Sequence, residues 1–263
     1  MNILPKNIPT NNMNAKKILS IALLFIGLAS CSNDNDDVKS TANLKLRSID
    51  LNYKDSNSDT THPINYTYDE ENRLSKVQTV MPNIIKLEFT YQNNLVYKIK
   101  LIEGNQFTDF TYYYNGDSII PYRIVAEGNK NFERNYQIIN NTISWNDESG
   151  RDFQIFLVGN KIDHAIMNED HIKITYSDAN ENFKENIQSL ELLTAMSFYN
   201  NASTLYAFDI YGIQLSKTPI QRCEMISDGQ IYDYELIKDL NGNVSQKVIN
   251  FPTNTITHTY TYN

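Results

Sequence analysis

The residue whose chemistry the sequence indicates most clearly is Cys31. An apolar run ends there in Leu28-Ala29-Ser30-Cys31, so two small residues come directly before the cysteine. This pattern predicts a lipoprotein signal that is cleaved before Cys31, which then carries lipid on its sulfur; an ordinary secretory signal is the alternative. An anchor with two or more acyl chains holds a protein stably on a membrane, because each buried CH₂ contributes about 0.8 kcal/mol.

The segment before this cysteine has the parts of a signal peptide. Lys16-Lys17 is a short basic region, and residues 18–29 are apolar apart from Ser20. The apolar stretch is shorter than the roughly 20 residues that a membrane-spanning helix needs, and it fits the core of a secretory signal. We therefore assign residues 1–30 to a signal peptide. We take Met13 as the true start, because the residues before it have no signal-peptide character.

An acidic stretch follows the cysteine directly, in Ser32-Asn33-Asp34-Asn35-Asp36-Asp37. It predicts a flexible acidic linker over residues 31–43 that keeps the folded part away from the membrane. An acidic stretch at this position also resembles the export signal that Bacteroidetes lipoproteins use to reach the outer leaflet. We therefore expect a lipid anchor in the bacterial outer membrane, exposed on the cell surface, with the periplasmic face as the alternative.

The charge of the chain argues against a nucleic-acid partner. The formal net charge is −8, from 23 Lys and Arg against 31 Asp and Glu, and loss of the signal with its lysines makes it more negative. Nucleic acids and anionic lipid headgroups both need a basic surface. Cys223 has no partner once Cys31 is lipidated, so we expect no disulfide and a small, buried Cys223.

Alternating apolar residues indicate the fold class. Ile85, Leu87, Phe89 and Tyr91 fall on one face of a strand, with charged and polar residues between them. Such alternation is typical of antiparallel strands with one buried and one wet face. We predict an all-β antiparallel meander over residues 44–263, a single domain that forms a curved extended sheet or an open barrel. A monomer is expected.

Turn and helix signals divide this domain. Asn115-Gly116, Asp228-Gly229 and Asn241-Gly242 predict two-residue hairpin turns of type I′, in which both central residues have a positive φ. One segment departs from the alternation: apolar residues recur at helical spacing over residues 184–198. It predicts one short amphipathic helix that lies on the concave face of the sheet or plugs one end of it.

Two internal repeats point to a known family. Residues 102–106 and 126–130 are similar, and the unit Tyr66-Thr67-Tyr68-Asp69, completed by Asn72-Arg73-Leu74, has a degenerate partner at residues 232–244. This unit resembles the YD-type hairpin of bacterial surface proteins. Together with the lipoprotein signal and the stretch from Tyr211 to Pro219, it resembles a family of Bacteroidetes lipoproteins built on a domain of unknown function described as porin-like. The resemblance implies a curved sheet or open barrel and brings no known catalytic residues.

The remaining candidates for chemistry are weaker. His164 and His171 have acidic neighbours at Asp163, Glu169 and Asp170, but no metal-binding spacing is present, so a wet hairpin tip is expected. A second candidate begins like a calcium loop: Asp178, Asn180 and Asn182 match the pattern, and Phe183 and Ser189 break it. We expect no enzyme, no cofactor and no metal.

Two three-residue segments, Asp59-Thr60-Thr61 and Asp117-Ser118-Ile119, resemble acceptors of Bacteroidetes O-glycosylation. Thr60 and Ser118 are therefore candidate modification sites. Exposed tyrosines of Tyr112-Tyr113-Tyr114 could stack on sugar rings or hold an apolar ligand; ordinary cross-strand pairing is the alternative. The leading hypothesis is a non-enzymatic surface lipoprotein with a binding or structural role, whose partner is a glycan, a protein or an apolar ligand. A periplasmic carrier or chaperone for an apolar ligand is the second hypothesis, and a transmembrane barrel is the third.

Overall fold

The structure is a computed structural model that describes residues 45–79, 85–147, 149–167, 170–179, 190–198, 213 and 215–263. Asn43–Asn263 form one compact unit. The signal peptide (1–30), Cys31 and the linker (31–43) lie outside the described residues, so these assignments stay predictions. No helix in the described part of the chain is long and apolar enough to cross a membrane.

The described residues form 17 strands and one helix, α2 (Leu190–Phe198). The first strands are β1 (Leu46–Asp55), β2 (Asp59–Tyr68), β3 (Leu74–Thr79), β4 (Ile85–Gln92), β5 (Leu95–Glu103), β6 (Gln106–Tyr113), β7 (Arg123–Gly128), β8 (Phe132–Asn135) and β9 (Gln137–Ile139). The others are β10 (Thr142–Asn146), β11 (Asp152–Val158), β12 (Lys161–Met167), β13 (Asp170–Tyr176), β14 (Ile220–Met225), β15 (Gln230–Lys238), β16 (Val244–Asn250) and β17 (Asn254–Tyr262).

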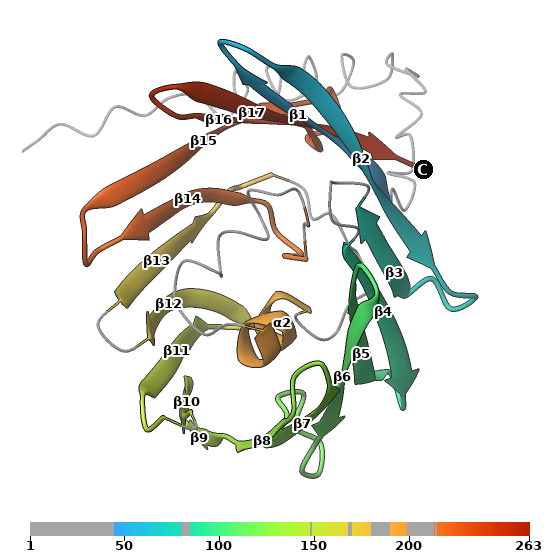
Figure 1. Cartoon of the computed structure of the whole chain (residues 1–263), viewed down its shortest axis with the longest axis vertical. Coiled ribbons are helices and arrows are strands. Elements are labelled where there is room, and N and C mark those ends of the chain that lie inside the picture. Colours follow the sequence, from blue (N-terminus) through green and yellow to red (C-terminus); the bar gives the residue numbers. More distant parts are fainter. Residues whose placement is uncertain are drawn as a thin grey trace, which may run out of the picture. The chain divides into compact units, whose positions relative to one another are not determined.

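The strands form a nearly closed, barrel-like ring (Figure 1). Successive strands other than β8 and β9 pair antiparallel, and β1 pairs with both β2 and β17, so the first and last strands of the chain lie side by side. The sheet is interrupted at Tyr136, between β8 and β9. Before it, β8 pairs with β7; after it, β9 pairs with β10. The predicted all-β antiparallel meander with one short helix is confirmed. Because β1 and β17 are far apart in sequence, local patterns could not show that the sheet closes on itself.

Most apolar side chains point into the ring, and most polar ones point out. In β2, Ile64 and Tyr66 are buried while Asn65 and Thr67 between them are exposed. Outside, charged residues face each other across strands, as Glu88 does with Lys100. The interior is therefore a packed hydrophobic core, and the outer face suits contact with water.

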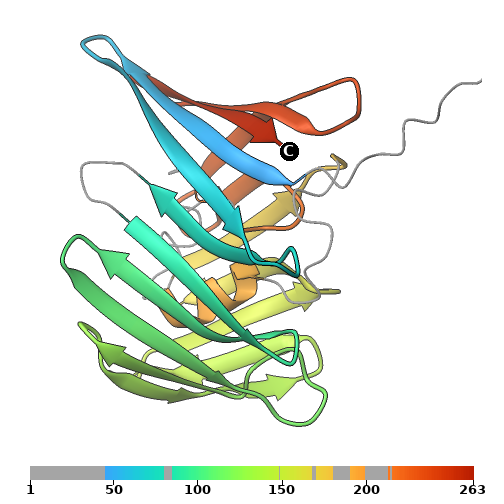
Figure 2. The same cartoon turned by 90° about the vertical axis from the view of Figure 1, so that its right-hand side faces the viewer.

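Helix α2 lies inside the ring, between walls of obliquely running strands (Figure 2). All nine of its residues are buried. The predicted short helix is therefore present, but its described part has no exposed polar face, because protein surrounds α2; residues 184–189 lie outside the described residues. The polar groups of α2 are paired: Ser197 Oγ lies 2.6 Å from Tyr112 OH, and Tyr176 OH donates to Glu191 Oε2 at 3.0 Å.

The three predicted hairpin turns are longer than expected. Of their residues, Gly116, Gly229 and Gly242 have a positive φ, and the residue before each glycine does not. The two-residue pattern instead occurs at Asn93 and Asn94, which have φ values of 51° and 61°. Asparagine tolerates this left-handed conformation better than most residues, so a turn without glycine supplies the type I′ geometry here.

Four tyrosines make the same hydrogen bond at equivalent places in the ring, and Tyr68 of the repeated YD-type unit is one of them. At the ends of β2, β4 and β17 and just after β6, each tyrosine hydroxyl donates to a carbonyl near the start of the preceding strand. The bonds are Tyr68 to Leu46 (2.8 Å), Tyr91 to Leu74 (2.8 Å), Tyr114 to Val96 (2.7 Å) and Tyr262 to Val244 (3.0 Å). We call this end of the ring the tyrosine rim. Burial raises the pKa of Tyr68, Tyr91 and Tyr262 well above the usual range, so these hydroxyls stay protonated donors at neutral pH.

Candidate functional site

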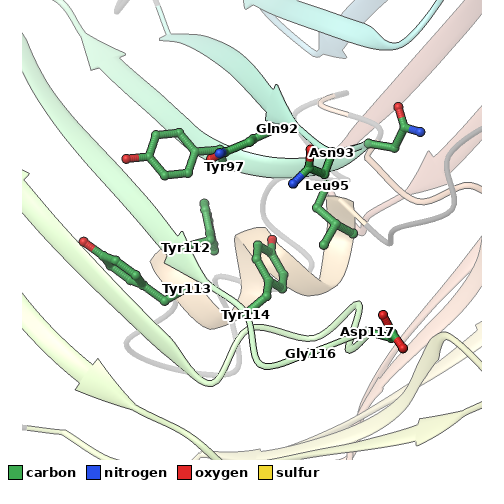
Figure 3. Close-up of a pocket in the computed structure, with 10 residues that line it drawn as sticks. Gln92, Asn93, Leu95, Tyr97, Tyr112, Tyr113, Tyr114, Gly116 and Asp117 are labelled. Atoms are coloured by element: carbon green, nitrogen blue, oxygen red, sulfur yellow. The ribbon is translucent and has the colours of Figure 1, made fainter.

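A cavity of about 660 Å³ opens at the tyrosine rim, between the β4–β5 turn and the chain after β6 (Figure 3). Aromatic and amide side chains dominate its lining. The lining residues are Gln92, Asn93, Asn94, Leu95, Tyr97, Tyr112, Tyr113, Tyr114, Gly116 and Asp117. Pockets that bind small ligands usually have volumes of about 300–1,000 Å³, so this rim pocket can hold one.

A β-bulge places the most exposed ring of the rim pocket. The β4–β5 register pairs Thr90 with Lys98 and Tyr91 with Val96, so Tyr97 is the extra residue. Bulges re-aim the side chains beside them, and Tyr97 remains 39% exposed. Figure 3 shows the rings of Tyr97 and Tyr113 projecting to the same side, with Asp117 at the opposite end of the rim pocket.

The other tyrosines of the rim pocket are fixed by their contacts. Tyr112 and Tyr114 are tied down by the hydroxyl bonds described above. The Arg123 guanidinium lies 4.0 Å from the centre of the Tyr113 ring, and Arg123 Nη1 donates to Glu133 Oε1 at 3.2 Å. Tyr112 is buried, so the rim pocket presents the rings of Tyr113 and Tyr114 in fixed orientations, which reduces the entropy lost when a ligand binds.

The structure separates the two candidate glycosylation sites. Thr60 is exposed on β2, where it pairs in register with Tyr53. Ser118 is half-buried: its Oγ donates to the Ile120 carbonyl at 2.8 Å and accepts from the Ile120 N–H at 3.1 Å. Both modifications stay predictions.

The histidine candidates form no metal site in the described residues. The rings of His164 and His171 lie 5.3 Å apart, and His164 Nδ1 is 2.8 Å from Asp163 Oδ2. Burial and the neighbouring His164 lower the pKa of His171 below its usual value. No group of three or more His, Cys, Asp or Glu among the described residues could hold a metal ion. Glu169 lies outside the described residues.

Of the calcium-loop candidate only Asp178 is described, whereas Cys223 is described fully. Asp178 accepts from Lys238 Nζ at 2.5 Å, while Asn180, Asn182, Phe183 and Ser189 lie outside the described residues. Cys223 is fully buried, as predicted.

Sequence reasoning missed a buried polar pair inside the ring. Lys247 lies opposite His258 across β16 and β17, and both are fully buried. The Lys247 ammonium lies 3.9 Å from the centre of the Tyr234 ring, a cation–π contact. One signal was available: Lys247 lies at an inward position between Val244 and Ile249, two apolar residues of the same strand.

Comparison with known proteins gives a limited result. No family model matches the chain, and no curated protein matches it. Among solved structures, it is similar to a porin-like protein from Bacteroides uniformis, with 16% identity, a TM-score of 0.49, and coverage of 83% of this chain and 96% of that one. It is also similar to a porin-like protein from Bacteroides vulgatus, with 9% identity, a TM-score of 0.38, and coverage of 83% and 99%.

Proposed function

We propose that this protein is a lipid-anchored, non-enzymatic binding protein of a bacterial envelope and that its rim pocket binds a neutral glycan. The observation that carries the proposal is the pairing of fixed tyrosine rings with amide side chains in one open cavity. Aromatic faces pack against the apolar C–H faces of sugars. Amides such as Asn93 and Gln92 both donate and accept, which suits sugar hydroxyls.

The distribution of side chains supports a ring that stands in water. A transmembrane barrel carries an apolar band outside and polar residues inside. Here the outer face holds charge pairs such as Lys98 with Asp109, whose charged atoms lie 3.5 Å apart, and the inside is an apolar core. A ring with such charge pairs on its outer face needs a separate anchor, which the predicted lipid on Cys31 supplies.

The carrier hypothesis has less support. It needs room for an apolar ligand between the sheet and the helix. The α2 side chains already occupy that interface, where the ring centres of Phe198 and Phe110 lie 4.7 Å apart and Tyr136 OH donates to the Met196 carbonyl at 2.7 Å. We therefore place the ligand at the rim of the ring.

Replacing Tyr97 by alanine is expected to weaken glycan binding about tenfold, which corresponds to a loss of about 1.4 kcal/mol. The change removes the most exposed ring of the rim pocket. Binding is measured by calorimetry on the full-length protein in detergent, with neutral hexasaccharides of glucose, xylose and mannose as probes. Tyr122→Ala is the matched control, because Tyr122 is 41% exposed and does not line the rim pocket. Absence of binding to every probe, or equal losses in both variants, contradicts the glycan proposal.

Replacing Cys31 by alanine is expected to move the protein from the membrane fraction to the soluble fraction, because the lipid has no other attachment point. The measurement is fractionation of cells followed by immunoblotting, with Cys223→Ala as the control. Protease treatment of intact cells then locates the anchor: digestion of the wild-type protein supports surface exposure, and protection supports the periplasmic face. A Cys31→Ala variant whose signal peptide has been removed, as its mass shows, and that still stays in the membrane fraction would rule out the lipid anchor.

A further inference from the structure

A second cavity opens at the opposite rim of the ring, where β8 begins and β10 turns into β11. It has a volume of about 390 Å³. Its lining residues are Lys130, Asn131, Phe132, Arg134, Asp147, Ser149, Arg151 and Ser197. We call it the basic cavity. The Tyr112–Ser197 hydrogen bond lies between the two cavities, since Tyr112 lines the rim pocket and Ser197 lines the basic cavity.

Arg134 is the most deeply placed cation of the basic cavity, with 8% of its surface exposed. Its Nη1 donates to the Met196 carbonyl at 3.2 Å, and its guanidinium lies 4.5 Å from the centre of the Phe132 ring. These contacts fix the plane of the guanidinium. A guanidinium has five N–H donors, and the Met196 carbonyl accepts from one of its nitrogens, Nη1.

Arg151 is held in place by a turn. Its Nε donates to Asp147 Oδ2 at 2.6 Å, while Asp147 Oδ1 accepts from the backbone N–H of Ser149 and of Arg151, each at 2.9 Å. Although burial acts to raise it, these hydrogen bonds hold the pKa of Asp147 well below the usual range. Asp147 therefore stays ionised at physiological pH, and its contacts keep a second guanidinium at the mouth of the basic cavity.

The charge of the basic cavity is opposite to that of the protein. Its described lining carries Lys130, Arg134 and Arg151 against Asp147, while the whole chain has a formal charge of −8. Lys130 makes no ion pair with any residue that the structure describes. A concave site lined by one sign of charge concentrates ligands of the other sign.

We propose that the basic cavity binds a small carboxylate anion of the size of a single sugar acid. Guanidinium groups match the geometry of carboxylate and phosphate oxygens. The Asp147 carboxylate in the lining disfavours a doubly charged phosphate, which leaves a singly charged carboxylate as the ligand class. This site is separate from the rim pocket and does not depend on the glycan proposal.

The test is calorimetric titration of the full-length protein in detergent with D-glucuronate, with D-glucose and inorganic phosphate as comparison probes. We expect glucuronate to bind, glucose not to bind, and affinity for glucuronate to fall as salt is raised. Lys130→Glu places a carboxylate in the basic cavity and is expected to weaken glucuronate binding at least about tenfold, since like charges in a site repel. Lys173→Glu, the same change at an exposed position of β13, is the control and is expected to leave affinity nearly unchanged.

Three results would overturn the proposal. The first is no heat of binding with glucuronate. The second is binding of phosphate but not of glucuronate, which would reassign the ligand class. The third is an equal loss in the Lys130→Glu and Lys173→Glu variants, which would show attraction to the whole protein rather than a site. Rim-pocket binding of neutral hexasaccharides, measured on the same variants, keeps this outcome distinct from failure of the glycan proposal.

Discussion

Replacing Phe110 by alanine is expected to lower the free energy of unfolding by about 3–5 kcal/mol, the cost typical of truncating a buried phenylalanine. Phe110 is fully buried in β6 and meets Phe198 of α2 edge to face, with ring centres 4.7 Å apart. It also lies 6.1 Å from the ring of Phe132 in β8. The change leaves a cavity where the helix joins the wall of the ring. Urea denaturation followed by circular dichroism measures the loss.

The matched control is Phe107→Ala, three residues earlier on the same strand. Phe107 is 49% exposed, and its ring centre lies 4.6 Å from the Lys100 ammonium. Removing this exposed cation–π contact is expected to cost about 0.5–1 kcal/mol. Equal losses in the two variants would contradict the view that α2 is packed against β6 as part of the core.

Replacing Gly128 by alanine is expected to destabilise the protein by about 2–3 kcal/mol, because Gly128 has a φ of 124°, a region that side chains avoid. A Cβ there would also lie 2.4 Å from the Phe107 carbonyl oxygen, too close for any real contact. That oxygen belongs to the backbone and accepts from Asn129 N at 2.8 Å, so it cannot move away freely. Thermal or urea unfolding provides the measurement.

The control comes from the repeated sequence itself. Gly104 occupies the position of Gly128 in the similar segment 102–106, but its φ is 60° and a Cβ there would meet nothing within 4 Å. Gly104→Ala is therefore expected to cost only about 1 kcal/mol, for the left-handed conformation alone. If Gly104→Ala costs as much as Gly128→Ala, the close approach to Phe107 does not determine the difference.

Local patterns in the sequence were enough to predict the fold class and the strand faces. Alternating apolar residues such as Leu87 and Phe89 are buried, as expected, because burial of apolar surface is the main force in folding. The alternation can be recognised within a single strand, without knowledge of its neighbours. The tyrosine-rich units were visible too, although their role was not: the bond from Tyr68 to the Leu46 carbonyl spans 22 residues. The prediction that lipid is attached at Cys31 also rests on the sequence alone.

The surroundings of each element, in contrast, depend on how the whole chain packs. Helical spacing over residues 184–198 suggested one exposed face, yet α2 is buried on all sides because the ring encloses it. Closure depends on β1 meeting β17, a contact between opposite ends of the chain. Both cavities combine residues from separate strands or turns, and Arg134 reaches Met196 from 62 positions away. Local sequence fixes which face of a strand is apolar, whereas neighbours distant along the chain are set by the packing of the whole ring.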